Sequence, residues 1–355
     1  MLNDILNTFG VQSGTYISEK LNSGLINHTW KISSEGREYI LQQINKNVFK
    51  SPGDIVKNIR ALDSFLAENS PDYLFVSFLP SSSGEYIVQD GSEEFYRLMP
   101  FVKNSKTLTV VTTKQEAYEA ALQFGKFTSL LSNFEIAKLS YTLPDFHNLT
   151  LRFEQFKQAY RNATTERLNE AESAIKDAFN HQEIVQTYKS IVTDSLIPLR
   201  VIHHDTKISN VLFNKDHLGI CVIDLDTVMP GYFFSDVGDM LRTYLSPANE
   251  EEKDFSKISI REDFFQAIIE GYCTEMASVL TQAEKELFIY SGKFMIYMQA
   301  IRFLTDFLNG DIYYSHSYPK HNLKRAQNQF VLLKRYIAAE ETFSKIILTF
   351  LNSKY

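Results

Sequence analysis

The sequence has very little cysteine: only Cys221 and Cys273 occur in 355 residues. Cys221 lies in an apolar, strand-like run and Cys273 in a helix-like run, so both are expected to be buried thiols. Two such cysteines exclude a small disulfide-stabilised scaffold and do not support a metal site built from thiolates. They favour a reducing compartment.

The chain also lacks an excess of positive charge and any long apolar segment. Lysine and arginine number 36 against 43 aspartate and glutamate residues, a formal net charge of −7, which disfavours nucleic acid or an anionic membrane as a partner. No stretch reaches about 18 apolar residues without a charge, and the first ten residues do not resemble a signal peptide. We therefore expect a cytoplasmic protein that binds neither nucleic acid nor membrane.

Hydrophobic residues, by contrast, make up 44% of the chain, which is enough for at least one large core. In the first hundred residues, short apolar runs alternate with turn residues, which predicts an antiparallel sheet. The runs are Tyr39–Leu41, Leu74–Val76, Tyr86–Val88 and Phe95–Leu98. One helix is predicted between Pro52 and Glu68, because apolar residues there recur at helical spacing.

After residue 101 the helical spacing prevails. An aromatic and aliphatic stripe from Leu287 to Leu308 is expected to face a core, and the polar stretch from Arg152 to Ser190 predicts a pair of surface helices. Val211–Phe213 and Ile220–Ile223 are predicted to form a hairpin. The predicted fold class is α+β, with a small antiparallel-sheet lobe over residues 1–101 and a larger helical lobe over residues 102–355.

Polar residues gather at the ends of the hairpin strands. His203, Asp205 and Asn210 precede it, and Asp224 follows it. An apolar strand that ends in carboxylates is costly unless the charges meet a cation or a hydrogen-bond donor. Oxygen ligands without cysteine favour Mg²⁺, which usually completes its shell with phosphates and water. The pattern therefore points to nucleotide chemistry.

Phosphoryl transfer of the kinase type needs a carboxylate for the acceptor hydroxyl, an amide oxygen on Mg²⁺ and a second carboxylate on metal and phosphates. The sequence offers Asp205 as the base, with Asn210 and Asp224 as metal ligands. His203 is expected to hold the loop in place. The alternative is that these are turn and cap residues, since Asp and Asn favour turns in any case.

The motif His203-x-Asp205-x-x-x-x-Asn210, followed by Ile223-Asp224, resembles the catalytic and metal motifs of the aminoglycoside phosphotransferase and choline kinase family. More narrowly, the segments 204–213, 222–231, 302–306 and 308–311 resemble its N-acetylhexosamine 1-kinase branch. The resemblance implies a protein-kinase-like two-lobed fold, with a nucleotide-binding lobe at residues 1–101 and the catalytic loop, metal motif and sugar pocket in residues 102–355. It also implies ATP and Mg²⁺ as cofactors and phosphorylation of the anomeric (C1) hydroxyl of GlcNAc or GalNAc.

The resemblance assigns nucleotide contacts to a loop after the first strand, a second strand and a hinge. The candidates are Gly24, Asn27, Thr29, Gln42, Phe101 and Lys207. With one glycine, the loop could equally be an ordinary hairpin turn. Gln42 stands where most kinases carry the phosphate-binding lysine, and it supplies no charge. Lys207 is a candidate for that charge, or else a solvated surface residue.

For the acceptor, the resemblance points to Arg302, Asp306, Asp311 and His147. Arg302 and Asp306 are four residues apart on a predicted helix, so an ordinary surface ion pair is the alternative. His147 could be merely a loop residue.

Two further carboxylates, Asp226 and Asp239, are expected to support the site. Asp239 would support the catalytic loop or simply lie at a helix start, where Asp236 is expected to be the N-cap. Asp226 falls on the same strand face as Asp224, so it would touch a second metal or orient Asp205; solvation in a loop is the alternative.

Other functions stay open at this point. A kinase of the same fold could act on an aminoglycoside, choline or homoserine, because fold alone does not separate these substrates. The missing lysine would also suit a nucleotide-binding pseudokinase, and the same carboxylates could serve a metal-dependent hydrolase. The expected partners are a small-molecule sugar and ATP, and the expected state is a monomer.

Overall fold

The computed structural model describes residues 2–11, 16–21 and 26–353, and its chain divides into two compact units. The first unit comprises residues 1–107, 130–144 and 210–230. The second comprises residues 108–129, 145–209 and 231–355. The predicted lobe of residues 1–101 thus falls within the first unit, which also takes in two segments from later in the chain.

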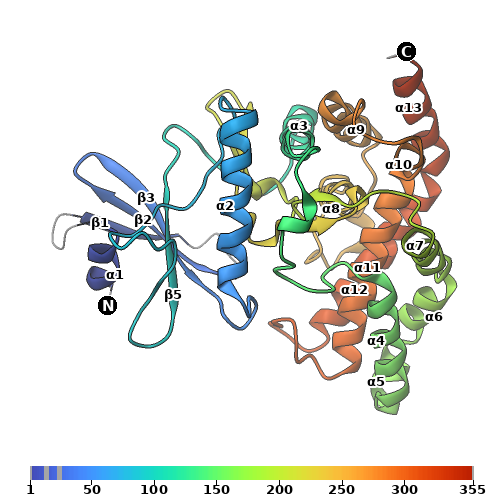
Figure 1. Cartoon of the computed structure of the whole chain (residues 1–355). Coiled ribbons are helices and arrows are strands. Elements are labelled where there is room, and N and C mark those ends of the chain that lie inside the picture. Colours follow the sequence, from blue (N-terminus) through green and yellow to red (C-terminus); the bar gives the residue numbers. More distant parts are fainter. Residues whose placement is uncertain (1, 12–15, 22–25, 354–355) are drawn as a thin grey trace. The chain divides into compact units, whose positions relative to one another are not determined.

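A five-stranded antiparallel sheet, with strand order β1-β2-β3-β5-β4, forms much of the first unit (Figure 1). Its strands are Tyr16–Leu21 (β1), His28–Ser34 (β2), Arg37–Ile44 (β3), Val88–Gln89 (β4) and Phe95–Pro100 (β5). Ile32, Leu41 and Leu98 lie at most 2% exposed and pack with Ile5 and Leu6 of α1 (Leu2–Thr8). The predicted antiparallel sheet is confirmed.

One predicted strand is wrong. Residues 74–76 form no strand, and the segment makes a single bridge, between Leu79 and Leu98. Val76 and Phe78 are buried, as the apolar run suggested. Both Leu79 and β4 pair with β5, however, so neither the segment around Leu79 nor β4 extends into a longer strand.

The predicted helix is confirmed as α2 (Pro52–Asn69), whose apolar face is fully buried. Asn58 on this helix is 1% exposed; its amide donates to the carbonyl oxygens of Ser140 (2.8 Å) and Val228 (3.0 Å) and accepts from the Ser140 N–H (2.8 Å). One buried amide therefore ties both later segments to the first unit.

Those later segments contain the predicted hairpin, which is confirmed. Its strands pair antiparallel, with Val211 opposite Val222. The elements are the 3-10 helix η1 (Ile136–Lys138), β7 (Val211–Phe213), β8 (Gly219–Val222) and the 3-10 helix η3 (Leu225–Thr227).

The second unit is mostly helical. Its longer helices are α3 (Lys114–Leu130), α4 (Leu149–Asn162), α7 (Glu183–Thr193), α8 (Phe233–Tyr244), α9 (Glu262–Met276), α11 (Phe288–Leu308), α12 (His321–Ala338) and α13 (Glu340–Ser353). Shorter elements are α5 (Thr165–Glu170), α6 (Glu172–Asn180), β6 (Arg200–Ile202), η4 (Phe255–Lys257) and α10 (Gln282–Glu286); η2 (Ile208–Asn210) and β9 (Met229–Gly231) each contain residues of both units. Together with the sheet of the first unit, these helices confirm the α+β class.

The core of the second unit is built on α11, which packs against α4, α8 and α12 (Figure 1). The predicted stripe is buried there: Phe294, Tyr297 and Ile301 are 0% exposed. Burial extends beyond the stripe, because neighbouring helices cover more than one face of α11.

Gly238 allows α8 to approach α11 closely. A Cβ atom at this position would lie 2.3 Å from the Ser291 carbonyl oxygen and 2.9 Å from Met295 Cβ. We expect Gly238→Ala to lower the free energy of unfolding by about 1–3 kcal/mol, because the two backbones must separate. Denaturant titration checks this, and Gly53→Ala, which has open space at its Cβ, is the control expected to be near neutral.

The polar stretch from Arg152 to Ser190 is not a pair of surface helices. It forms the greater part of four helices, α4 to α7, and each longer one buries an apolar face, with Phe156 at 0% and Ile191 at 1% exposure. Its charged residues dilute the helical periodicity in the sequence, which hides these faces.

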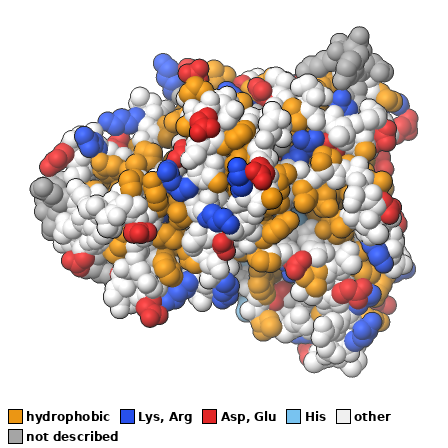
Figure 2. Space-filling model, viewed as in Figure 1, with side chains coloured by type: hydrophobic (Ala, Val, Ile, Leu, Met, Phe, Trp, Pro, Cys, Tyr) orange, Lys and Arg blue, Asp and Glu red, His pale blue; other side chains and the backbone are white. Residues whose placement is uncertain are grey.

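On the face shown in Figure 2, lysine and arginine side chains are interspersed with aspartate and glutamate and do not form one patch. Within the described part of the chain, every helix is too short or too polar to cross a bilayer.

Candidate active site

The segment that carries the proposed base is held in the second unit by two carboxylates of α8. Asp236 accepts hydrogen bonds from the N–H groups of His203 (3.0 Å) and His204 (2.7 Å). Asp239 accepts one from the Thr206 N–H (3.0 Å). Three backbone donors of this loop are therefore fixed by side chains of one helix.

The N-cap assignment of Asp236 is wrong. The N-cap of α8 is Tyr232, and Asp236 lies inside the first turn, 0% exposed. Burial raises the pKa of Asp236 to about 6, against the opposing effect of His203 and the two N–H groups. The sequence places an acidic residue near the helix start, but does not show that it faces the loop.

This raised pKa gives a testable pH dependence. The carboxyl group of Asp236 binds its proton more tightly in the folded chain than in the unfolded chain, so protonation of Asp236 stabilises the fold. This stabilisation is complete below the ordinary pKa of 3.8 and is lost as pH rises through about 6. Asp236→Asn lacks that titration. We expect the unfolding free energy of the wild type minus that of the variant to fall by about 3 kcal/mol across this window. Denaturant titration at several pH values checks it; a pH-independent difference would contradict it.

Asp205 itself stays accessible, with its side chain 20% exposed. Its N–H donates to His203 Nδ1 (3.3 Å), and Lys207 Nζ lies 3.1 Å from its Oδ1. Lys207 is therefore an ion-pair partner of Asp205 and not an isolated surface charge.

The two histidines of the motif make different contacts. His203 is 0% exposed, and its ring meets the edge of Phe124 at 5.1 Å between centroids. His204 has a left-handed backbone (φ 66°), and its Nδ1 lies 3.3 Å from Nδ1 of His147, whose ring stacks on Phe146. Burial and His204 hold the pKa of His147 well below its ordinary value. His147 is thus a neutral side chain in contact with the loop that carries the proposed base.

The proposed metal ligands belong to the first unit, at one end of the hairpin. The Asn210 carbonyl oxygen accepts from the Ile223 N–H (2.9 Å), so Asn210 and Asp224 flank paired strand ends. Asp224 is exposed and adopts a left-handed conformation (φ 61°). One amide oxygen and one carboxylate fit a hard cation such as Mg²⁺.

Gln42, at the position expected for a lysine, takes part in a buried network in the first unit. Its Oε1 accepts from Nε (3.1 Å) and Nη2 (2.7 Å) of Arg97, and its Nε2 donates to Thr29 Oγ1 (3.1 Å). Arg97 also forms an ion pair with Asp226, which accepts from Asn27 Nδ2 (2.8 Å). The guanidinium of Arg97 on the neighbouring strand β5 therefore lies at this position, with its charge balanced by Asp226.

Sequence reasoning missed Arg97. The signal available was one charged residue inside the apolar strand Phe95–Pro100, where a buried charge requires a partner. Arg97 is 1% and Asp226 2% exposed, so the solvated-loop alternative for Asp226 is wrong.

Gly24 and Phe101 are the remaining candidates for nucleotide contacts. Gly24 lies outside the described residues. The Phe101 N–H donates to the Glu38 carbonyl oxygen (3.1 Å), and Lys31 Nζ lies 4.1 Å from the centre of its ring. The Phe101 donor is therefore already used within the sheet.

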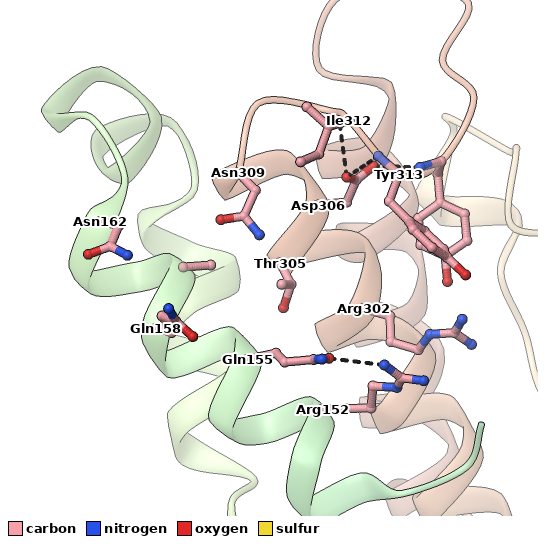
Figure 3. Close-up of a pocket in the computed structure, with 12 residues that line it drawn as sticks. Arg152, Gln155, Gln158, Asn162, Arg302, Thr305, Asp306, Asn309, Ile312 and Tyr313 are labelled. Carbon is pink, nitrogen blue, oxygen red and sulfur yellow. Dashed lines mark hydrogen bonds between the residues drawn. The ribbon is translucent and has the colours of Figure 1, made fainter. Parts of the chain in front are cut away.

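The acceptor candidates Arg302 and Asp306 lie on one cavity of the second unit, of about 410 Å³, between α4, α11 and the segment after α11 (Figure 3). The lining residues are Arg152, Gln155, Gln158, Ala159, Asn162, Arg302, Thr305, Asp306, Asn309, Ile312, Tyr313 and Tyr314. Four of these residues, Gln155, Gln158, Asn162 and Asn309, carry neutral amides.

Asp306 is not the ion-pair partner of Arg302. Its carboxylate accepts from the N–H groups of residues 312, 313 and 314 (2.7–3.0 Å) and from Asn322 Nδ2 (3.0 Å). It is 3% exposed and organises the segment that closes one side of the cavity. The surface ion-pair alternative is therefore wrong for this pair.

Asp311 lies beside the cavity and not among its lining residues. Its carboxylate accepts from Arg167 Nη1 (2.9 Å) and from Asn322 Nδ2 (3.0 Å). Asp311 is thus engaged in fixing the loop after α11.

Comparison with solved structures supports the fold over almost the whole chain. An aminoglycoside phosphotransferase from Alicyclobacillus acidocaldarius is 13% identical with a TM-score of 0.63, covering 98% of this chain and 96% of that one. A microcompartment-associated aminopropanol kinase is 15% identical with a TM-score of 0.63, covering 95% and 97%. A spectinomycin phosphotransferase in complex with ADP and spectinomycin is 13% identical with a TM-score of 0.58, covering 96% and 97%.

At these identities the structures establish the architecture, which is the kinase-like α+β fold that the motif resemblance implied. A family model supplies the assignment, because it matches residues 18–279, well over half of the chain. That range includes all of the sheet but the first two residues of β1, the loop with the proposed base, the hairpin and α8. The chain belongs to the phosphotransferase enzyme family.

Proposed function

We propose that this chain transfers the γ-phosphoryl group of ATP to the anomeric hydroxyl of an N-acetylhexosamine, giving the sugar 1-phosphate and ADP. Membership of the phosphotransferase enzyme family supports the transfer, and related structures carry ADP or AMP-PNP. The choice of acceptor rests on the cavity and on the motif resemblance of residues 302–311.

In this reaction Asp205 takes the proton of the acceptor hydroxyl as its oxygen attacks the γ-phosphorus. The new O–P bond forms, the bond to the β–γ bridging oxygen breaks, and ADP leaves with the electron pair. An anomeric hydroxyl is more acidic than an ordinary alcohol because the ring oxygen withdraws electron density, so a carboxylate base suffices. Asn210 and Asp224 would hold Mg²⁺, which neutralises phosphate charge when bound.

On the nucleotide side, Asn27, Thr29 and Gln42 would face the phosphates from a network in which Arg97 is paired with Asp226. Lys207, 42% exposed and paired with Asp205, would supply positive charge. We further propose that Gly24 lies in the phosphate loop and that the backbone near Phe101 reads the adenine edge.

The single observation that carries the acceptor class is the charge of the cavity. Asp306 is the one acidic residue among its described lining residues, and donors already occupy both of its oxygens. Arg152 and Arg302 would repel the amines of aminoglycosides, aminopropanol or choline. Neutral amides such as Gln155 and Asn309 instead suit the hydroxyl and acetamido groups of a sugar.

ADP release with Mg-ATP and a panel of acceptors tests this proposal. The panel contains GlcNAc, GalNAc, their 1-O-methyl glycosides, an aminoglycoside, choline and homoserine. We expect release with GlcNAc or GalNAc that disappears with the methyl glycosides. Release with an amine acceptor alone would contradict the proposal, and phosphate release without any acceptor would indicate a hydrolase.

A further inference from the structure

Two arginines line the cavity without an acidic partner. Arg152 on α4 donates to Gln155 Oε1 (3.0 Å) and to the carbonyl oxygens of Asp145 (3.0 Å) and Phe146 (3.4 Å), and Arg302 on α11 donates to Gln299 Oε1 (3.3 Å). All of these acceptors are neutral. Within the described residues, neither guanidinium forms an ion pair, and the buried Nε of Arg152 has no hydrogen-bond partner.

The two charges also act on each other. Burial and the neighbouring Arg302 lower the pKa of Arg152, against smaller opposing effects of Tyr314, Tyr313 and Asp145, so Arg302 makes the charged form of Arg152 less favourable. Two partly desolvated cations with only neutral acceptors are costly unless an anion joins them. Arg302 further lies 5.6 Å from the ring centres of Phe146 and Tyr314, which hold it at the cavity.

The rest of the cavity is different in character. Figure 3 shows Arg152 and Arg302 together at one end, and Gln158, Asn162 and Asn309 toward the other. A volume of about 410 Å³ is within the usual range for a small-molecule site. The cavity thus offers a cationic end and a neutral hydrogen-bonding body.

The cationic end is linked to the catalytic loop by direct contacts within the second unit. Arg302 lies over Phe146, Phe146 stacks on His147 (4.4 Å between centroids), and His147 meets His204 (3.3 Å). His204 directly precedes Asp205. A ligand held by Arg302 is therefore close to the segment that carries the proposed base.

We propose that the acceptor carries an anionic group, a carboxylate or a phosphate ester, which Arg152 and Arg302 bind together while the amide side chains bind its neutral body. Planar guanidinium groups suit both anions because each can donate two parallel hydrogen bonds. That the acceptor is a sugar rests on the proposed function. Together, the two proposals narrow the substrate class to acidic N-acetylhexosamine derivatives. The anion takes no part in bond making; the transfer step is the one written above.

The test measures kcat/KM of the full chain with Mg-ATP and four acceptors. They are GlcNAc, GlcNAc 6-phosphate, N-acetylglucosaminuronic acid and the non-sugar hydroxy acid glycerate. We expect one of the two acidic sugars to exceed GlcNAc by at least about tenfold, because charge-assisted hydrogen bonds are the stronger ones. A preference for GlcNAc 6-phosphate would identify the anionic group as a phosphate ester, and a preference for N-acetylglucosaminuronic acid would identify it as a carboxylate.

Variants connect the preference to the two arginines. Arg152→Gln and Arg302→Gln are each expected to remove about tenfold or more of the preference for the acidic sugar over GlcNAc, mainly through KM. Arg302→Lys keeps the positive charge and should retain part of the preference for the acidic sugar. The matched control is Arg161→Gln, which removes an exposed arginine from the same helix, and it should leave all four rates unchanged. Thermal unfolding confirms that each variant is folded.

The outcomes separate the two proposals. Turnover of GlcNAc without a preference for acidic sugars, or a preference that survives both Gln variants, would overturn the inference and leave the proposed function standing. Turnover of glycerate but of none of the sugars, sensitive to both arginines, would overturn the sugar and keep the anionic acceptor. If calorimetry detects no binding of any acidic compound and none is turned over, the inference is overturned.

Discussion

Asp205→Asn is expected to lower turnover by roughly 10²- to 10⁴-fold, with little change in the affinity for ATP. The amide has the size of the carboxylate but cannot accept the acceptor's proton, and general-base catalysis contributes about that factor. Loss of the partly exposed pair with Lys207 should cost little stability, because such pairs are weak. ADP release gives the rate, and calorimetry with a non-hydrolysable ATP analogue gives the affinity.

The matched control is Asp216→Asn, which makes the same chemical change at an exposed turn of the β7–β8 hairpin. Its rate should equal that of the wild type. If Asp205→Asn kept its rate within about tenfold of the wild type, Asp205 would not be the base.

Arg97→Met is expected to lower the free energy of unfolding by about 3–5 kcal/mol, the largest stability effect that we predict. The substitution leaves Asp226, 2% exposed, with a buried charge and without its ion-pair partner, and it removes two hydrogen bonds to Gln42. Denaturant titration of the full chain measures the loss.

Two further variants separate the buried pair from a general effect of removing arginine. Arg60→Met breaks a partly exposed pair with Asp63 (2.9 Å) and should cost no more than about 1 kcal/mol. Adding Asp226→Leu to Arg97→Met removes both buried charges and should restore part of the lost stability. Equal losses for Arg60→Met and Arg97→Met would show that the buried pair contributes nothing.

Much of the fold could be predicted because its signals are local. The spacing of apolar residues over Pro52–Glu68 and Leu287–Leu308 is enough to predict α2 and α11, and the Val211–Phe213 and Ile220–Ile223 runs predict the hairpin. The prediction of a strand at residues 74–76 is wrong because a strand needs a free sheet edge to pair with. Whether the edge of β5 is free depends on which other segments pair with it.

The missing parts of the site depend on contacts between distant residues. Arg97 and Asp226 are 129 positions apart, and no local pattern indicates that they meet. Arg152 lies in a stretch whose polarity suggested surface. The sequence predicts Asp306 as a substrate residue but does not show that its carboxylate accepts from an irregular segment six to eight residues onward, because the conformation of such a segment has no periodic signal.

The attachment to α8 of the loop that carries the proposed base has a consequence for substrate binding. The N–H groups of His203, His204 and Thr206 are already bonded to carboxylates of the helix, so no substrate is needed to order this part of the backbone. Ordering a loop on binding costs conformational entropy for every residue that becomes fixed. Here that cost is met during folding, and the binding free energy of an acceptor is available for affinity and for alignment with Asp205.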